Sequence, residues 1–183
     1  PSGSSISDMT GALYGSIVFA AVSADYGWEL WKSDGTESGT VLVKDIRPGN
    51  LGSAPSGMCL AKYGSFDAVY FAADNGSNGT ELWRSDGTLG GTWLVKDIRP
   101  GAAGSNPSDF VAMGGKCYFT ADAEGDGRRE LWVTNGYDSG TYVVADWLHV
   151  GSSPCQLIAD LQRMYFTEGN TLYAFVPAGT PPP

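Results

Sequence analysis

The chain has 183 residues, including 26 Gly, 6 Trp, 9 Tyr and 7 Phe, and its formal net charge is −9. This length suits one ordinary domain, and the aromatic content excludes a disordered chain. The negative charge disfavours nucleic acid and anionic membranes as partners, because both attract basic surfaces, and the longest purely apolar run, residues 17–22, is too short for a membrane-spanning helix.

The predicted elements come in repeats. Residues 1–9 are interpreted as an N-terminal linker or as a closing segment, in which Ile6–Met9 would complete the last unit of the fold. A Glu-Leu-Trp-x-Ser-Asp-Gly-Thr motif then occurs twice in full and once in a weaker form, at 29–36, 81–88 and 130–136. Trp83 follows Trp31 by 52 residues, and Trp132 follows Trp83 by 49 residues. A period of about 50 residues indicates a fold built from repeated units.

The third unit shows the elements of one repeat most clearly. Its short, alternating apolar segments predict four strands separated by glycine-containing turns. The predicted strands are 110–113, 116–121, 130–133 and a segment headed by Gly140-Thr141. The Asp-Gly or Asn-Gly pair that follows the third strand supplies the positive φ that a tight turn requires.

Residues 155–168 allow two interpretations. Apolar side chains within this stretch recur at helical spacing, which alone would favour an amphipathic helix. The stretch also aligns without a gap with residues 110–121 of the third unit, and this alignment predicts a hairpin instead. Residues 171–173 then take the Glu-Leu-Trp position, and no fourth strand is predicted after them.

Four-stranded units of this length are the sequence signature of β-propeller blades. The predicted fold is therefore all-β: a β-propeller of about four four-stranded antiparallel blades, three full and one truncated, without significant helix. The predicted domain is 10–176, with units at about 10–56, 57–108, 109–154 and 155–176, followed by a Pro-rich linker at 177–183. A closed four-bladed propeller, part of a larger propeller and an open stack of units are the alternatives.

The second unit resembles the ELWxxDGT repeat family, through ELWRSDGT at 81–88 and GTWLVKDI at 91–98. The resemblance extends over residues 10–176. It implies a secreted or cell-surface protein with propeller-like repeats, commonly part of a large multidomain chain, and it implies no established enzymatic activity. The third unit departs from the motif at Thr134-Asn135-Gly136, and the fourth keeps only its hydrophobic pattern, as in a terminal capping repeat.

The carboxylates of the motif allow a catalytic and a structural interpretation. Glu29 and Glu81 recur, as do Asp34 and Asp86, and pairs of carboxylates perform acid–base catalysis in many enzymes. Because every full unit contains both, we interpret them as residues of turns and unit contacts rather than as a single active site.

The tryptophans fall into two groups. Trp31, Trp83 and Trp132 could stack on sugars, but their fixed place within a strand favours the core between units. Trp28 and Trp93 do not recur as tryptophan, which makes them candidates for exposed ligand contacts.

One acidic loop resembles the opening of a calcium-binding loop. Asp122, Glu124 and Asp126 alternate before Gly127, so their carboxylates could converge on a hard cation. Val133 stands where such loops have their final Glu, and the alternative is a solvated acidic loop. Calcium is thus the one cofactor that the sequence suggests.

The sequons and the cysteines are candidate modification sites of an extracellular protein. The sequons at Asn75 and Asn78 predict N-glycosylation of at least one of them. The three cysteines permit one disulfide, and Cys117–Cys155 is the predicted pair, although the sequence also allows pairings with Cys59. No basic and apolar leader opens the sequence, so a secretion signal is expected to have been removed or to lie outside it.

We therefore expect a non-enzymatic structural or adhesive glycoprotein domain, extracellular or at the cell surface, that forms one module of a larger protein or of an assembly such as a matrix or surface filament. Its expected partners are other copies of itself, other extracellular proteins and glycans. The alternative is a carbohydrate-binding, lectin-like propeller, with a site in the loops around Trp28, 75–80 and 122–129. A propeller glycosidase or lyase ranks third.

Overall fold

A computed structural model describes residues 5–11, 13–150, 157–160, 163–168 and 171–176 of the chain. These residues form fifteen β-strands, and the one helical element among them is a 3₁₀ turn at Asp138–Gly140. The all-β class that the sequence predicts is confirmed.

The strands form four antiparallel sheets that follow one another in chain order. The first two sheets contain β1 (Ile6–Met9), β2 (Ile17–Ser23), β3 (Gly27–Ser33) and β4 (Val41–Lys44), then β5 (Ser56–Tyr63), β6 (Phe66–Asp74), β7 (Thr80–Ser85) and β8 (Trp93–Lys96). The last two contain β9 (Ser108–Met113), β10 (Lys116–Ala121), β11 (Arg129–Thr134) and β12 (Tyr142–Val150), then β13 (Ile158–Ala159), β14 (Met164–Glu168) and β15 (Thr171–Phe175). Each strand pairs with its neighbour in sequence, as in a meander.

The hairpin predicted for the last unit is confirmed, and the amphipathic helix is absent from its described residues. Ile158 pairs with Tyr165 and Ala159 with Met164, while Phe166 pairs with Tyr173. The described part of this sheet has three strands.

The N-terminal segment differs from its prediction. Ile6–Met9 does not complete the last unit but pairs with β2, where Met9 lies opposite Phe19. Pairing of Ile6–Met9 with β2 closes a much shorter loop than pairing with a strand of the last unit would. Closing a shorter loop costs less conformational entropy.

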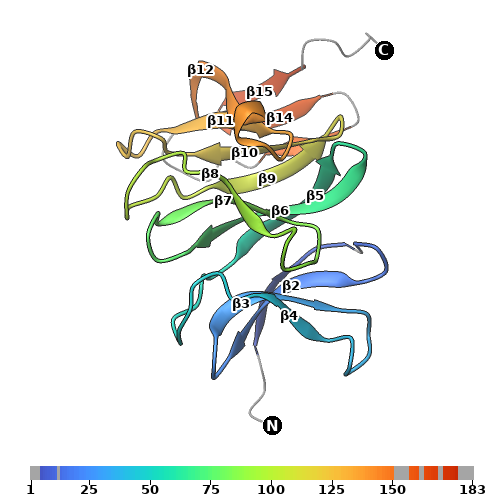
Figure 1. Ribbon diagram of the computed structural model, residues 1–183. Coiled ribbons are helices and arrows are strands. Elements are labelled where there is room, and N and C mark those ends of the chain that lie inside the picture. Colours follow the sequence, from blue (N-terminus) through green and yellow to red (C-terminus); the bar gives the residue numbers. More distant parts are fainter. Residues whose placement is uncertain (1–4, 12, 151–156, 161–162, 169–170, 177–183) are drawn as a thin grey trace.

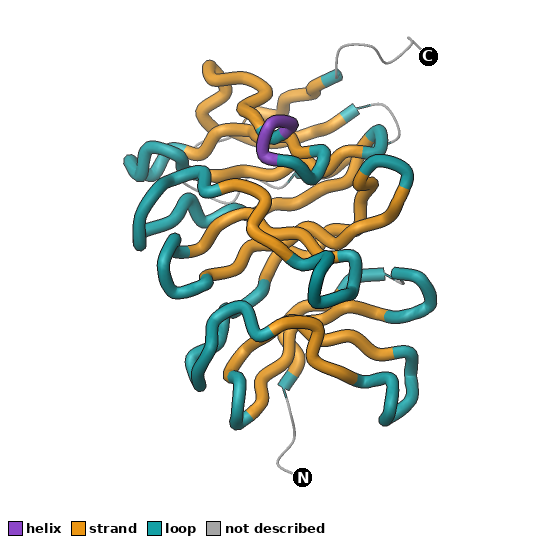
Figure 2. Tube along the Cα trace, viewed as in Figure 1, coloured by secondary structure: helices purple, strands orange, loops and turns teal. Residues whose placement is uncertain are grey.

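The four sheets stack face to face, with the N-terminal sheet and the C-terminal sheet at opposite ends of the stack (Figures 1 and 2). The first strands of successive sheets contact one another, β1 with β5, β5 with β9 and β9 with β13. The core therefore lies in layers between sheets rather than in one central mass.

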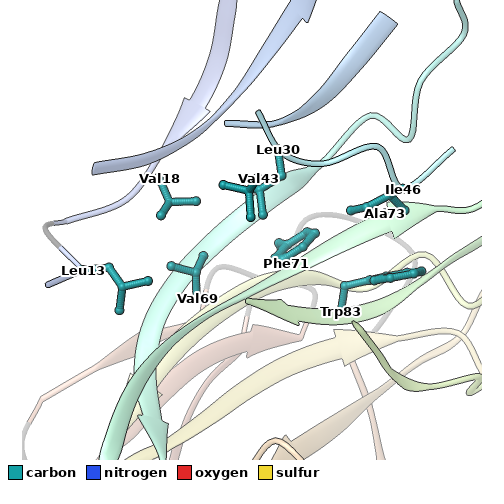
Figure 3. Packing of buried hydrophobic residues seen from close by; sticks show 9 residues of the cluster. All are labelled: Leu13, Val18, Leu30, Val43, Ile46, Val69, Phe71, Ala73 and Trp83. Atoms are coloured by element: carbon teal, nitrogen blue, oxygen red, sulfur yellow. The ribbon is translucent and has the colours of Figure 1, made fainter. Parts of the chain in front are cut away.

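The first interface shows how a layer is built. Leu30, Val43 and Ile46 of the first unit share one buried cluster with Phe71 and Trp83 of the second (Figure 3). Phe71 and Trp83 are cross-strand partners on β6 and β7. An aromatic pair of one sheet thus packs against the aliphatic face of the sheet before it.

The same arrangement recurs at the next two interfaces. Leu82, Val95 and Ile98 meet the pair Phe119 and Trp132, and Leu131 and Val144 meet the pair Phe166 and Tyr173. Because successive strand residues point to opposite faces, the Leu of each Glu-Leu-Trp motif faces the next unit and its Trp faces the preceding one.

Candidate functional site

The glutamate of the motif holds the connection to the next unit. Glu29 is completely buried, and its two oxygens accept hydrogen bonds from the backbone N–H groups of Ile46 (3.1 Å), Arg47 (2.9 Å) and Ser53 (3.0 Å). The Ser53 hydroxyl donates a fourth bond at 2.6 Å. Burial raises the pKa of Glu29, and these hydrogen bonds oppose that shift.

Glu81 repeats this arrangement one unit later. It accepts bonds from the backbone N–H groups of Ile98 (3.0 Å), Arg99 (3.0 Å) and Ser105 (2.8 Å) and from the Ser105 hydroxyl (2.6 Å). Burial raises the pKa of Glu81 as well. Both oxygens of each glutamate are occupied by protein donors, as expected for a structural carboxylate.

The aspartate of the motif organises the turn that follows. Asp34 Oδ1 accepts bonds from the backbone N–H of Thr36 (2.9 Å) and from its hydroxyl (2.7 Å), and these bonds lower the pKa of Asp34. Asp86 makes the same two bonds to Thr88. In the third unit Asn135 accepts a bond from the N–H of Tyr137 (3.1 Å), so the amide preserves part of the turn. These bonds commit the motif carboxylates Asp34 and Asp86 to their turns.

The carboxylates of the acidic loop before β11 accept hydrogen bonds from the loop's own backbone. Asp122 uses both carboxylate oxygens to accept bonds from the N–H groups of Gly125 (2.6 Å) and Gly127 (3.0 Å). Asp126 accepts a bond from the N–H of Arg128 (2.9 Å). Within the described residues no group of three His, Cys, Asp or Glu side chains could hold a metal ion, so Asp122, Glu124 and Asp126 do not converge. Calcium binding at this loop stays a prediction.

The two sequon asparagines lie together in the β6–β7 loop. Asn75 Nδ2 donates to Asn78 Oδ1 at 2.9 Å, and Asn78 Nδ2 donates to Asp97 at 2.7 Å. The nitrogen that a glycan would modify is therefore bonded within the protein at both sites. Glycosylation stays a prediction.

The buried cysteine Cys117 has Cys59 as its neighbour. Cys59 on β5 packs against the buried cluster that contains Cys117 on β10, and both carry free thiols. A side-chain hydrogen bond with Cys117 lowers the pKa of Cys59, whereas burial raises the pKa of Cys117. Cys155, the partner predicted from sequence, lies outside the described residues.

The most unusual side chain in the structure is Arg84 on β7, which is only 2% exposed. Its guanidinium carbon lies 3.3 Å from the centroid of the Tyr63 ring and 3.6 Å from that of the Trp93 ring. Attraction between the cation and the two π faces offsets part of the cost of burying the charge. Burial lowers the pKa of Arg84, which still remains a cation at neutral pH. Its Nε and Nη1 atoms have no hydrogen-bond partner within the described part of the chain.

Arg84 borders a cavity of about 520 Å³ between the first two units. The other lining residues are mainly aromatic and acidic: Tyr14, Tyr63, Phe66, Asp67, Asp86 and Thr88. The Tyr14 hydroxyl accepts a bond from the N–H of Asp67 at 3.0 Å, which connects the first unit to the second at the cavity wall. A hollow lined by aromatic side chains and a few charged groups is a candidate binding site.

The two ligand-contact candidates from sequence are separate. Trp93 is part of the Arg84 cluster, whereas Trp28 lies on β3, where its carbonyl accepts bonds from the N–H groups of Ser53 (2.8 Å) and Ala54 (3.1 Å). In an antiparallel meander, successive connections alternate between the two ends of the sheet. The β5–β6 and β7–β8 turns beside Arg84 therefore lie at one end of the strands, and the loops expected to form a lectin site lie at the other end. Arg84 was not identified from the sequence. The one indication was that Arg84 stands at a variable position of the motif, which is Lys32 in the first unit and Val133 in the third.

The motif tryptophans differ in exposure. Trp83 and Trp132 are buried between sheets, whereas Trp31 on the first sheet is half-buried and lines a cavity of about 200 Å³ together with Phe19 and Ile6. The first sheet thus has one face that no other described sheet covers.

No protein-family model matches the chain, and the search of curated proteins finds no match. A search of the described residues for a helix long and apolar enough to cross a membrane finds none.

Proposed function

We propose that this chain is a propeller-type repeat domain that acts outside the cell as a non-enzymatic structural or adhesive module of a larger protein or assembly. The observation that carries this proposal is the use of the repeated carboxylates. Glu29 and Glu81 each accept four hydrogen bonds from the connection to the next unit, and Asp34 and Asp86 each close a turn. The carboxylates of the motif, which could otherwise suggest catalysis, thus make hydrogen bonds that stabilise the turns and the connections between successive units.

The propeller arrangement is supported by the repeat period, by the four-stranded units and by the contacts among first strands β1, β5, β9 and β13. The extracellular location is supported by the sequons at Asn75 and Asn78 and by the resemblance to ELWxxDGT repeats. The intact mass of the native protein, measured before and after enzymatic removal of N-glycans, tests this part. A mass shift supports a secreted glycoprotein, and an unmodified native mass contradicts it.

Adhesion is tested with the folded chain immobilised on a surface, by measuring retention of extracellular matrix material from the native source. Specific, saturable retention supports the adhesive role. Turnover of a polysaccharide that survives purification and is abolished by one carboxylate substitution contradicts the non-enzymatic role.

A second candidate function is binding of an acidic carbohydrate at the Arg84 cavity. Aromatic side chains stack on the apolar faces of sugars, and the Arg84 guanidinium attracts a carboxylate, whereas Asp67 and Asp86 in the same lining oppose one. A glycan array that includes uronic-acid oligosaccharides tests this function. Saturable binding to uronates that Arg84→Met abolishes supports it.

The matched control is Lys32→Met, which changes the same motif position in the first unit. Binding that both variants lose equally, or that neither loses, contradicts a site at Arg84.

A further inference from the structure

The first sheet presents an apolar face built for contact with another sheet. Phe19 on β2 and Trp31 on β3 are cross-strand partners and line a cavity of about 200 Å³ on this face. Ile6 on β1 borders the same cavity and is 52% exposed. The face is therefore continuous across three strands.

Every other unit has this aromatic pair at the same register, packed against the preceding sheet. In the first unit Phe19 is itself only 6% exposed, so the accessible part of the face is the half-buried Trp31 together with Ile6. The equivalent pairs are Phe71 with Trp83, Phe119 with Trp132 and Phe166 with Tyr173. Each of these pairs lies in a buried cluster shared with the preceding sheet. The Phe19–Trp31 pair therefore has the same side chains as the three internal interfaces. It differs from them because no preceding sheet packs against it among the described residues.

The three internal interfaces also define what covers such a pair. On the opposing sheet it is always the Leu of the Glu-Leu-Trp position, namely Leu30, Leu82 or Leu131. All three leucines are fully buried. The natural occupant of the Phe19–Trp31 face is thus another sheet of this repeat that presents its leucine.

The other end of the stack offers such a leucine. Leu172 on β15 holds the Glu-Leu-Trp position of the last unit, next to Tyr173, which pairs with Phe166. It is 68% exposed, unlike its three counterparts. The two ends lie at opposite extremes of the stack (Figure 1), so one chain in this conformation does not cover its own Phe19–Trp31 face.

We propose that the Phe19–Trp31 face binds the Leu172 face of a second copy of this chain, in the register of the internal interfaces, so that copies associate head to tail. This inference rests on the proposed function as a module of an assembly and names its partner. A contact between two different faces repeats from copy to copy, and it produces a closed ring or an open filament according to the rotation between copies.

Sedimentation velocity over a concentration series tests the proposal with four proteins: the wild type, Ile6→Glu, Leu172→Glu and the control Leu89→Glu. Leu89 is 66% exposed in the β7–β8 turn, away from both faces, so its variant has the same change of charge and apolarity. We expect the average mass of the wild type and of Leu89→Glu to rise with concentration, while Ile6→Glu and Leu172→Glu each stay monomeric alone.

The decisive sample is an equimolar mixture of Ile6→Glu and Leu172→Glu. One variant keeps an intact Leu172 face and the other an intact Phe19–Trp31 face, so the mixture forms a dimer that cannot grow further. Circular dichroism and thermal unfolding verify that both variants are folded, which their exposed positions favour.

Three results overturn the proposal: a wild type that is monomeric at every concentration, variants that associate as the wild type does, or a mixture that stays monomeric while the wild type associates. A monomeric wild type would mean that something else binds the Phe19–Trp31 face, and it would leave the proposed non-enzymatic role unaffected. Polysaccharide turnover would contradict the non-enzymatic role and would not alter the average mass in sedimentation. Failure of this inference and failure of the proposed function are therefore distinguishable.

Discussion

Leu30 and Trp83 occupy neighbouring positions of the same Glu-Leu-Trp motif in successive units, and they lie in one buried cluster between the first two sheets. Residues next to each other on a strand point to opposite faces, so each motif contributes to two different interfaces. Its Leu contacts the unit ahead and its Trp contacts the unit behind. Among the described residues, the Trp face of the first sheet has no such unit behind it.

Trp83 and Trp31 are a matched pair for a stability test. Trp83→Ala removes a side chain that is 6% exposed and leaves a cavity, so we expect a loss of about 3–5 kcal/mol in the free energy of unfolding. Trp31→Ala acts on an uncovered face and should cost about 1 kcal/mol at a concentration where the chain is monomeric. Urea unfolding measures both, and equal losses would contradict the difference in packing.

Glu81 should be essential to the connection between the second and third units. Glu81→Ala leaves the buried N–H groups of Ile98 and Ser105 without their acceptor, and we expect a loss of at least about 3 kcal/mol. Glu37→Ala, which removes an exposed carboxylate, is the control and should have little effect. A loss at Glu81 no larger than that at Glu37 would show that the bonds do not hold the units together.

Glu81 also predicts a pH dependence. Because burial raises its pKa in the folded state, the folded protein binds this proton more tightly than the unfolded chain does. The resulting stability is present below the unfolded pKa and is lost as the pH rises through the folded pKa. The free energy of unfolding of the wild type, relative to Glu81→Gln, should therefore fall as the pH rises from the ordinary glutamate pKa of about 4.3 towards neutral pH. Unfolding curves across this range measure it, and a relative stability that rises with pH would refute the predicted direction.

Cys59 and Cys117 should form a disulfide when folded protein is incubated with oxidised glutathione. The Cys59 thiolate attacks the glutathione disulfide and releases one glutathione thiol, and Cys117 then displaces the second as the protein disulfide forms. Closing this loop should stabilise the chain by about 4 kcal/mol. Peptide mapping identifies the pair, and Cys155→Ser should form it unchanged. A Cys117–Cys155 link would instead support the pairing expected from sequence.

Substitution of Arg84 should affect ligand binding while changing the stability of the fold little. Arg84→Met keeps the packing between Tyr63 and Trp93 and removes a buried charge with unpaired N–H groups, so we expect a stability change within about 1 kcal/mol. Thermal unfolding measures this change. A loss above about 3 kcal/mol would indicate that the cation is needed for folding rather than for a ligand.

The strands and turns could be predicted well from the sequence because the same pattern of apolar residues and glycines recurs in each repeat. The alternation in 110–121 and the glycines at positions such as Gly87, which has φ of +83°, depend on local chemistry alone. The role of Ile6–Met9 was wrong because pairing partners depend on loop closure, which the repeat alignment does not describe.

The candidate site was less predictable. Arg84, Tyr63 and Trp93 come from three different strands, and only the fold brings them together. The pairing of Cys59 with Cys117 likewise depends on how β5 packs against β10, a contact between sheets that leaves no periodic signal in the sequence.

The central claim is that another sheet of this repeat covers the Phe19–Trp31 face. The most direct test is a ¹⁹F NMR concentration series on protein labelled with 5-fluorotryptophan, with the Trp31 resonance assigned from Trp31→Phe. The account predicts that the Trp31 resonance shifts or broadens as concentration rises, while the resonance of the buried Trp83 stays constant, and that Leu172→Glu abolishes the Trp31 change. A Trp31 resonance that is insensitive to concentration while the chain associates would contradict it.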